Sequence, residues 1–141
     1  IGYPSTESQM QIIKAQRYQN PLLDLHEVTN AENILGVQNY LASVRAEDSV
    51  LRYAIRLCEA TREHPLVEQG ISPRGVAALV RMAKAGAVIR ERNYVIPEDV
   101  RSVYEDVCAH RLSLRAQARV EGISARDVLG EIADKVRPGE Q

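Results

Sequence analysis

The sequence contains no phenylalanine and no tryptophan, and its aromatic residues are six tyrosines among 141 residues. Its core must therefore be built mainly from leucine, isoleucine, valine and alanine, which favour packed helices over sheets. No apolar run approaches the roughly 20 residues that span a membrane. The first residues also lack the basic, apolar and small-residue sections of a signal peptide. We expect an all-α, cytoplasmic protein without a membrane partner.

Neither sign of charge is in excess. Lysine and arginine together number 18, aspartate and glutamate number 19, and the formal net charge is -1. This balance gives no global attraction to nucleic acid or to an anionic membrane. We therefore expect no nucleic-acid partner, and any anion-binding site has to be local.

Cysteine and histidine are too scarce and too scattered to form a metal site. Cys58 and Cys108 lack the CxxC spacing, and each lies among apolar residues of an expected helix. The histidines form no HxxxH pair and have no cysteine nearby to complete a metal shell; they are His26, His64 and His110. We predict reduced thiols in the core and no bound metal.

Capping signals and apolar residues at three- and four-residue spacing predict a helical bundle in one domain. The expected helices cover residues 6–17, 29–44, 48–62, 73–93, 97–110 and 124–136. Thr6 and Thr29 open T-x-x-Q and T-x-x-E capping boxes, and Ser72 caps a helix whose first residue is Pro73. On the third of these helices, the apolar stripe of Val50, Leu51, Ala54, Ile55 and Cys58 should face the core.

Two further segments carry specific expectations. Gly86, followed by Ala87, would let a neighbouring backbone approach the fourth helix closely, although glycine costs about 1 kcal/mol there in helix propensity. Residues 112–120 alternate loosely between apolar and polar types, which is compatible with a short hairpin or an irregular return.

The sequence carries no catalytic set. It contains no GxxxxGK[ST], no apolar run ending in paired acids and no GxSxG, so we expect these residues alone to bind no cofactor. One local inconsistency stands out: Arg74 occupies the second position of a helix, where the dipole disfavours a cation by ~0.3–1 kcal/mol. Either an anion such as phosphate offsets this cost, or Arg74 is simply solvated.

The segment Gly70-Ile71-Ser72-Pro73-Arg74 resembles the G-x-S-P-R motif in the lid of MoxR-family AAA+ ATPases, in which the arginine is called sensor 2. Further segments resemble the same lid in the same order, and together they cover nearly the whole chain; they are residues 2–4 (GYP), 60–65 (ATREHP) and 94–100 (YVIPEDV). The sequence departs from the family at Ile96, where a serine or threonine cap is common, and at Gln9, where a charged residue is usual.

The resemblance implies that residues 1–141 form an all-helical C-terminal lid, which follows a nucleotide-binding core that this chain does not include. The parent protein would bind ATP and Mg²⁺ through that core, hydrolyse the ATP, assemble into hexameric rings and remodel a partner protein in a chaperone-like manner. Arg74 would be its catalytic and nucleotide-binding sensor.

Two more sites follow from the resemblance, each with an alternative. Ile12 and Ile13 match the aliphatic pair that often lines the adenine pocket in AAA+ proteins, or they pack in an ordinary core. Arg62 faces the nucleotide or a neighbouring subunit, or it is a solvated arginine that the C-terminal dipole of its helix favours.

Two rival functions need no ATPase core. The first is a stand-alone helical protein-interaction module. The second is a helix-turn-helix DNA binder, because the fourth helix and its end also carry Arg81, Lys84, Arg90 and Arg92. The balanced charge argues against DNA, and a steep salt dependence of DNA binding would distinguish this reading.

Overall fold

The computed structural model describes residues 2–16 and 21–139. Their contacts divide the chain into two compact units, residues 1–36 and residues 37–141. The first unit contains α1 (Thr6–Gln16), the 3₁₀ helix η1 (Pro21–Asp24) and the first part of α2 (Ala31–Tyr40). All the side chains described in this unit are exposed.

The predicted helix caps of the first unit are each wrong by one residue. Ser5, rather than Thr6, caps α1, because its Oγ accepts the N–H of Ser8 at 3.2 Å. Asn30, rather than Thr29, caps α2, because its Oδ1 accepts the N–H of Asn33 at 2.9 Å. Serine and asparagine cap helices better than threonine does, so the stronger neighbour holds the position in both cases. The predicted end of the first helix, Arg17, lies outside the described residues.

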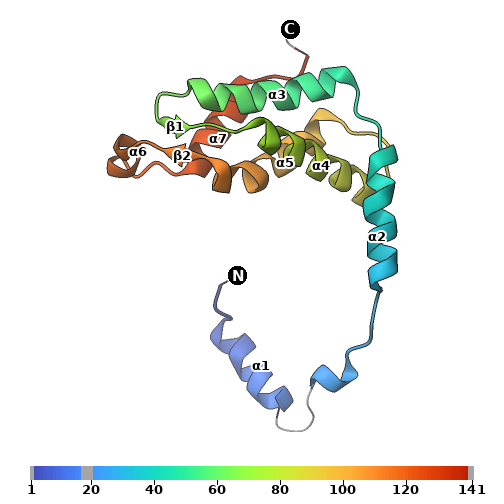
Figure 1. Cartoon of the computed structure of the whole chain (residues 1–141). Helices are drawn as coiled ribbons and strands as arrows, with labels where there is room; N and C mark the ends of the chain where they lie inside the picture. Colours follow the sequence, from blue (N-terminus) through green and yellow to red (C-terminus); the bar gives the residue numbers. More distant parts are fainter. Residues whose placement is uncertain (1, 17–20, 140–141) are drawn as a thin grey trace. The chain divides into compact units, whose positions relative to one another are not determined.

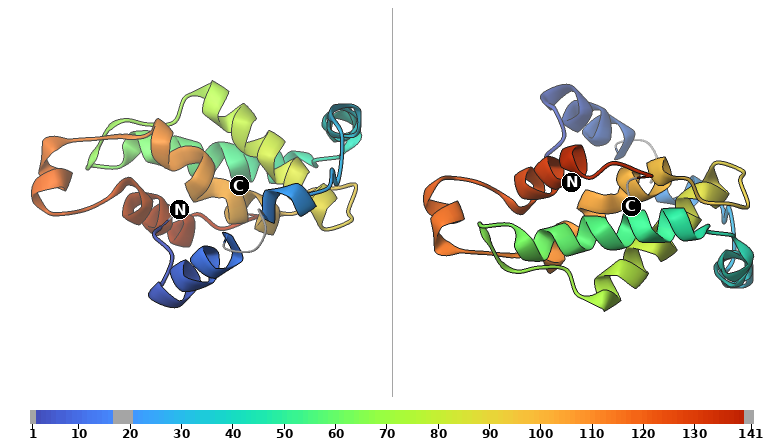
Figure 2. Two further views of the ribbon diagram at one scale, coloured as in Figure 1. Left: turned by 90° about the horizontal axis from the view of Figure 1, so that it is seen from below. Right: turned by 90° about the horizontal axis from the view of Figure 1, so that it is seen from above.

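The second unit is a helical bundle, which confirms the all-α prediction. Figure 1 and both views of Figure 2 show its longer helices packed side by side, with a small strand pair and α6 at one end. In chain order the elements that follow α2 are η2 (Leu41–Ser43), α3 (Asp48–Glu63), β1 (Val67–Gln69), α4 (Pro73–Ile89), α5 (Pro97–Cys108), η3 (Ala109–Arg111), β2 (Ser113–Leu114), α6 (Ala116–Val120) and α7 (Ala125–Lys135).

Two tyrosines fill the centre of the bundle in place of the absent phenylalanine and tryptophan. Tyr53 on α3 and Tyr104 on α5 are the largest fully buried side chains. The Tyr104 hydroxyl donates to the carbonyl oxygen of Leu57 at 2.8 Å, so its polar end is satisfied inside the core. The predicted stripe on α3 is right for Val50, Ala54 and Cys58 but wrong for Ile55, which is 41% exposed. The buried face of α3 includes Tyr53 instead, and Ile55 lies outside this face.

Residues 112–120, expected as a short hairpin or an irregular return, form no hairpin of their own but contribute one strand and a short helix. Ser113 and Leu114 form β2, which pairs antiparallel with β1 so that Leu114 lies opposite Val67, and residues 116–120 form α6. A two-residue strand is too short to show a period of its own. Its partner lies far away in sequence, so no local pattern could reveal the pairing.

Candidate functional site

The first turn of α4 presents the arginine that the sequence singles out. Ser72 caps the helix as predicted, with its Oγ accepting the N–H of Gly75 at 3.4 Å, and Pro73 is the first helical residue. Arg74 follows at the second position, where its side chain is exposed. That side chain makes no hydrogen bond and no ion pair within the described part of the chain.

The loop before α4 is attached to the end of α3 by a buried threonine. The Thr61 hydroxyl donates to the carbonyl oxygen of Cys58 at 2.5 Å and accepts the backbone N–H of Ile71 at 2.9 Å. Both Thr61 and Ile71 are fully buried. A buried N–H that lost this acceptor would cost about 1–3 kcal/mol. The Thr61 hydroxyl therefore holds the loop, at Ile71, against the end of α3.

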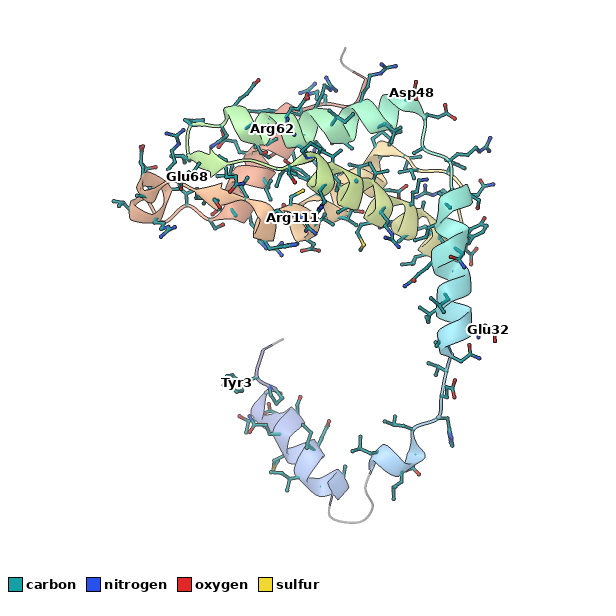
Figure 3. The ribbon with its side chains drawn as sticks, in the orientation of Figure 1. Tyr3, Glu32, Asp48, Arg62, Glu68 and Arg111 are labelled. Atoms are coloured by element: carbon teal, nitrogen blue, oxygen red, sulfur yellow. The ribbon has the colours of Figure 1, made fainter. Side chains whose placement is uncertain are left out.

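Arg62 adds a second attachment to the same loop. Its Nε donates to the carbonyl oxygen of Ile71 at 3.0 Å, and Figure 3 shows Arg62 on α3 above the loop that leads from Glu68 into α4. Neither the nucleotide-facing nor the solvated interpretation anticipated this contact. Through Ile71, the neighbours Thr61 and Arg62 position the helix start that carries Arg74.

The two glycines of the G-x-S-P-R-G segment are required by close packing. A Cβ at Gly70 would lie 2.8 Å from the Arg62 backbone nitrogen and 2.8 Å from the Thr61 Oγ. A Cβ at Gly75 would lie 2.5 Å from the Ile71 Cγ2 atom. Only glycine allows the loop to approach the end of α3 and Ile71 to pack beneath the first turn of α4.

Gly86 is different, and the close backbone approach predicted there is wrong. The atom within 4 Å of a Cβ at Gly86 is the Nη1 of Arg90, at 2.9 Å, which is the far end of a long side chain. The neighbouring Ala87, by contrast, is fully buried.

We therefore expect Gly70→Ala to lower the free energy of unfolding of residues 1–141 by about 1–3 kcal/mol, because backbone atoms have to shift. Gly86→Ala is the matched control. Its loss should be smaller, because only the far end of the Arg90 side chain has to move, Arg92 still pairs with Asp99, and a helical alanine gains up to about 1 kcal/mol over glycine. Urea unfolding of the two variants checks this, and equal destabilisation by both would contradict the packing argument.

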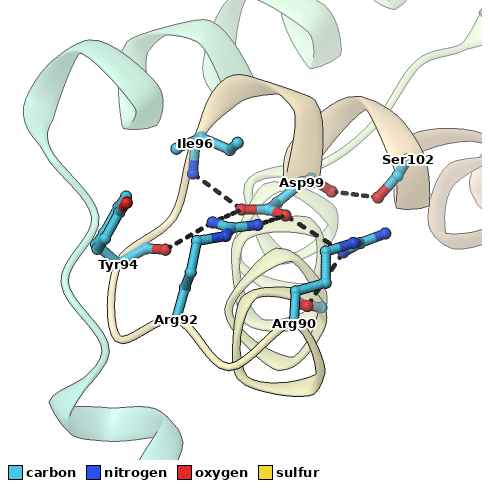
Figure 4. Close-up of polar contacts among 7 residues, drawn as sticks. Arg90, Arg92, Tyr94, Ile96, Asp99 and Ser102 are labelled. Carbon is cyan, nitrogen blue, oxygen red and sulfur yellow. Dashed lines mark hydrogen bonds and ion pairs between the residues drawn. The ribbon is translucent and has the colours of Figure 1, made fainter.

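The other end of α4 is held by a buried carboxylate on α5. Figure 4 shows Asp99 between two arginines that follow α4. Arg92 donates to both of its oxygens, at 2.7 and 2.6 Å, and Arg90 lies 3.3 Å from Oδ1. The Ile96 N–H donates to Oδ2 at 2.9 Å, so Asp99 also serves the first turn of α5. Asp99 is 2% exposed.

The arrangement keeps Asp99 ionised. Burial opposes its ionisation, but the hydrogen bonds from Arg92 and from the Ile96 N–H, together with the charges of Arg92 and Arg90, outweigh burial and hold its pKa below the usual value. We call Asp99, Arg90 and Arg92 the Asp99 cluster. With Thr61 and Arg62 at the first turn, it fixes α4 at both ends.

The sequence reading missed both of these roles. Thr61 lies inside the segment of residues 60–65, but no neighbouring residue indicates that its hydroxyl accepts a hydrogen bond from the loop before α4. The sequence indicates Asp99 only as part of residues 94–100, a segment that resembles the lid. Its position three residues after Ile96 is a capping signal that could have indicated part of its role. The two arginines that hold it follow the preceding helix and were counted among possible DNA contacts.

The predicted adenine pair lies in the other unit. Ile12 and Ile13 are on α1, where their side chains are 49% and 67% exposed. The described residues therefore provide no core around them, contrary to the ordinary-packing alternative. Their role toward adenine stays a prediction.

The buried thiols agree with the sequence prediction. Cys58 and Cys108 are free and buried, and the hydrogen bond between them, together with burial, raises the pKa of Cys58 above its usual value. Within residues 2–16 and 21–139, no cluster of three or more histidine, cysteine, aspartate or glutamate side chains could hold a metal ion. In the same residues, no helix has the length and apolar composition needed to cross a membrane.

Residues 59–132 match the model of a protein family described as the AAA lid domain. This chain belongs to that family. The matched segment includes the α3 end, the loop with Gly70, the first turn of α4 and the Asp99 cluster. The lid is of the MoxR type, because the relatives of this chain include chaperone MoxR1 and two proteins named MoxR.

Among the relatives of this lid is the uncharacterized protein YeaC of Bacillus subtilis, 35% identical over 137 residues, which are 97% of this chain and 43% of that protein. Chaperone MoxR1 of Mycobacterium tuberculosis is 30% identical over 145 residues, covering 96% of this chain and 38% of that protein. A solved structure from Cytophaga hutchinsonii, named a "putative ATPase", superposes with a TM-score of 0.87 at 29% identity, over 99% of this chain and 45% of that chain. The lid thus spans less than half the length of these relatives.

Proposed function

We propose that this lid supplies Arg74 to the phosphates of ATP bound by the core of its parent protein, and that nucleotide state sets the position of the lid. The observation that carries the proposal is a cation without a partner at the first turn of a helix that is fixed at both ends. The helix start that carries this arginine is held through Ile71, and the charge of the arginine is not neutralised by the described part of the chain.

The geometry fits a phosphate. The first turn of a helix leaves backbone N–H groups unpaired, and among the described residues the N–H of Arg74 has no acceptor while that of Gly75 is taken by Ser72. A phosphate at this position would satisfy that N–H and the positive end of the dipole. It would also offset the cost of a cation there, and the guanidinium could bind two of its oxygens at once.

ATP bound with Mg²⁺ would supply the phosphoryl group that is transferred. Residues 1–141 contain no P-loop, so we propose that the core of the parent protein binds both. The part of this lid is then electrostatic: Arg74 neutralises negative charge that builds up on the phosphates.

We propose that the exposed pair Ile12 and Ile13 lines the adenine base, since a flat base can cover aliphatic side chains that are otherwise open to water.

We further propose that the parent protein forms hexameric rings and performs chaperone-like remodelling of a partner protein. The name of the relative from Mycobacterium tuberculosis, chaperone MoxR1, supports the second part. Movement of the lid with nucleotide state would transmit the energy of hydrolysis to the partner.

The experiment compares the full-length protein with residues 1–141 expressed alone. We expect the full-length protein to hydrolyse ATP and the isolated lid to hydrolyse none, because phosphate cradling and Mg²⁺ coordination lie in the core. The circular dichroism spectrum of the isolated lid should show that it is folded. Turnover by the isolated lid that survives a contamination control would contradict the proposal, as would an inactive full-length protein.

A further inference from the structure

The surface of α4 beyond its first turn borders an open cavity of about 470 Å³. Its apolar lining comes from η2 and from α4; it consists of Leu41, Ala42, Ala77 and Val80. Two cations, Arg81 and Lys84, complete the α4 side. We call this cavity the α4 groove. All of its lining residues belong to the unit of residues 37–141.

The cations of the α4 groove are not used by the fold. Within the described ranges, Arg81 and Lys84 take part in no ion pair and no side-chain hydrogen bond. They lie three residues apart, which places them on one face of the helix. The groove lining includes no carboxylate to balance them. Arg90 and Arg92, in contrast, are committed to Asp99.

We propose that the α4 groove is a docking site for an acidic, amphipathic helical segment of a partner protein. An apolar side chain of that segment would fill the groove between Leu41 and Val80, while carboxylates one turn away would pair with Arg81 and Lys84. Apolar grooves bind the apolar face of amphipathic helices, and bordering charge of one sign favours a partner that carries the opposite charge. Its volume lies in the range of about 300–1,000 Å³ typical of binding pockets.

The apolar lining favours a peptide over nucleic acid. A phosphate backbone would use the two cations but would leave the aliphatic residues of the groove without partners, because nucleic acid has few apolar groups to place there. The proposal goes beyond the ATPase role, since this binding requires neither nucleotide nor Arg74.

The test uses the full-length protein and a fluorescein-labelled peptide of leucine and glutamate designed as an amphipathic helix. A peptide with lysine in place of glutamate and a short DNA duplex are the comparison probes. We expect the acidic peptide to bind, to bind more weakly as salt increases, and to lose at least about tenfold in affinity with Arg81→Glu and Lys84→Glu combined. Ala77→Trp, which fills the groove from an exposed position, should abolish binding.

The matched control is Arg119→Glu, which reverses an exposed arginine on α6 that likewise has no partner among the described residues; it should leave binding unchanged. No binding of the acidic peptide, equal binding of the lysine peptide, an equal loss with Arg119→Glu or preferential binding of the DNA duplex would each overturn the proposal. ATP hydrolysis and melting temperature of the Arg81 and Lys84 double variant should match the wild type, which separates this test from that of Arg74.

Discussion

Replacing Arg74 by alanine should lower the ATP turnover of the full-length protein about 100-fold, the typical loss when one preorganised electrostatic donor is removed from a reacting centre. The loss should exceed the effect on nucleotide affinity, because a contact that strengthens in the transition state contributes to turnover as well as to binding. Arg74→Lys should restore only part of the activity, since an ammonium lacks the planar fork that binds two phosphate oxygens. Steady-state kinetics at saturating ATP check both variants.

Stability should not change in either variant, because the Arg74 side chain is exposed and makes no contact that holds the described part of the lid together. Arg119→Ala, which removes another exposed arginine side chain without a partner in the described residues, is the matched control and should retain wild-type turnover. Wild-type turnover in Arg74→Ala would rule out the sensor role. A collapsed thermal melt of Arg74→Ala would show instead that the residue is structural.

Asp99→Ala should cost about 3 kcal/mol of the free energy of unfolding of residues 1–141. Breaking a buried ion pair by removing one partner typically costs about 3–5 kcal/mol, and the lower end applies because Arg92 retains 20% exposure and can reach water. The Ile96 N–H would also lose its acceptor. Asp99→Asn should fall between the wild type and alanine, because an amide oxygen still accepts hydrogen bonds without the charge. Urea unfolding near pH 7 measures all three.

The stabilisation by Asp99 should depend on pH in a definite direction. Because the pKa of Asp99 is lower in the folded state than the value of about 3.9 expected in the unfolded chain, the carboxylate stabilises the fold above about pH 4. This contribution is lost as the pH falls through the folded-state pKa. The difference between wild type and Asp99→Asn should therefore shrink in acid.

A matched surface substitution makes the Asp99 test specific. Asp134 pairs with Arg101 but is 75% exposed, and pairs of that kind contribute only about 0–1 kcal/mol. Asp134→Asn should therefore have little effect. If Asp99→Ala were as mild as Asp134→Asn, the Asp99 cluster would not be what holds the end of α4.

The sequence predicted those parts of the fold whose signals are local. The structure confirms the helix start predicted at Ser72 with Pro73, and Ser124, the first residue of the last expected helix, caps α7. Such signals are local because a cap and the N–H that it accepts lie within one turn. Where two capping residues compete, as at Ser5 beside Thr6, the pattern alone placed the boundary one residue late. The pairing of β1 with β2 joins segments far apart in sequence, and no period in either segment could indicate it.

The candidate site divides in the same way. The sequence located Arg74 through its conflict with the helix dipole and through the resemblance of its motif to the MoxR lid. It did not predict what holds the helix start that carries Arg74. The contacts of Thr61 and Arg62 with Ile71 cross from one helix to the loop before another, and those of Asp99 cross between helices. Such contacts depend on how helices pack, which helix periodicity does not specify.

The central claim is that Arg74 contacts the terminal phosphates of ATP. The most direct test is the ratio of the affinities of the full-length protein for a non-hydrolysable ATP analogue and for ADP, measured for wild type and Arg74→Ala by calorimetry. If Arg74 binds the phosphate that ADP lacks, the wild type should prefer the ATP analogue and Arg74→Ala should lose most of that preference, while its affinity for ADP changes little. An unchanged ratio in Arg74→Ala would contradict the claim.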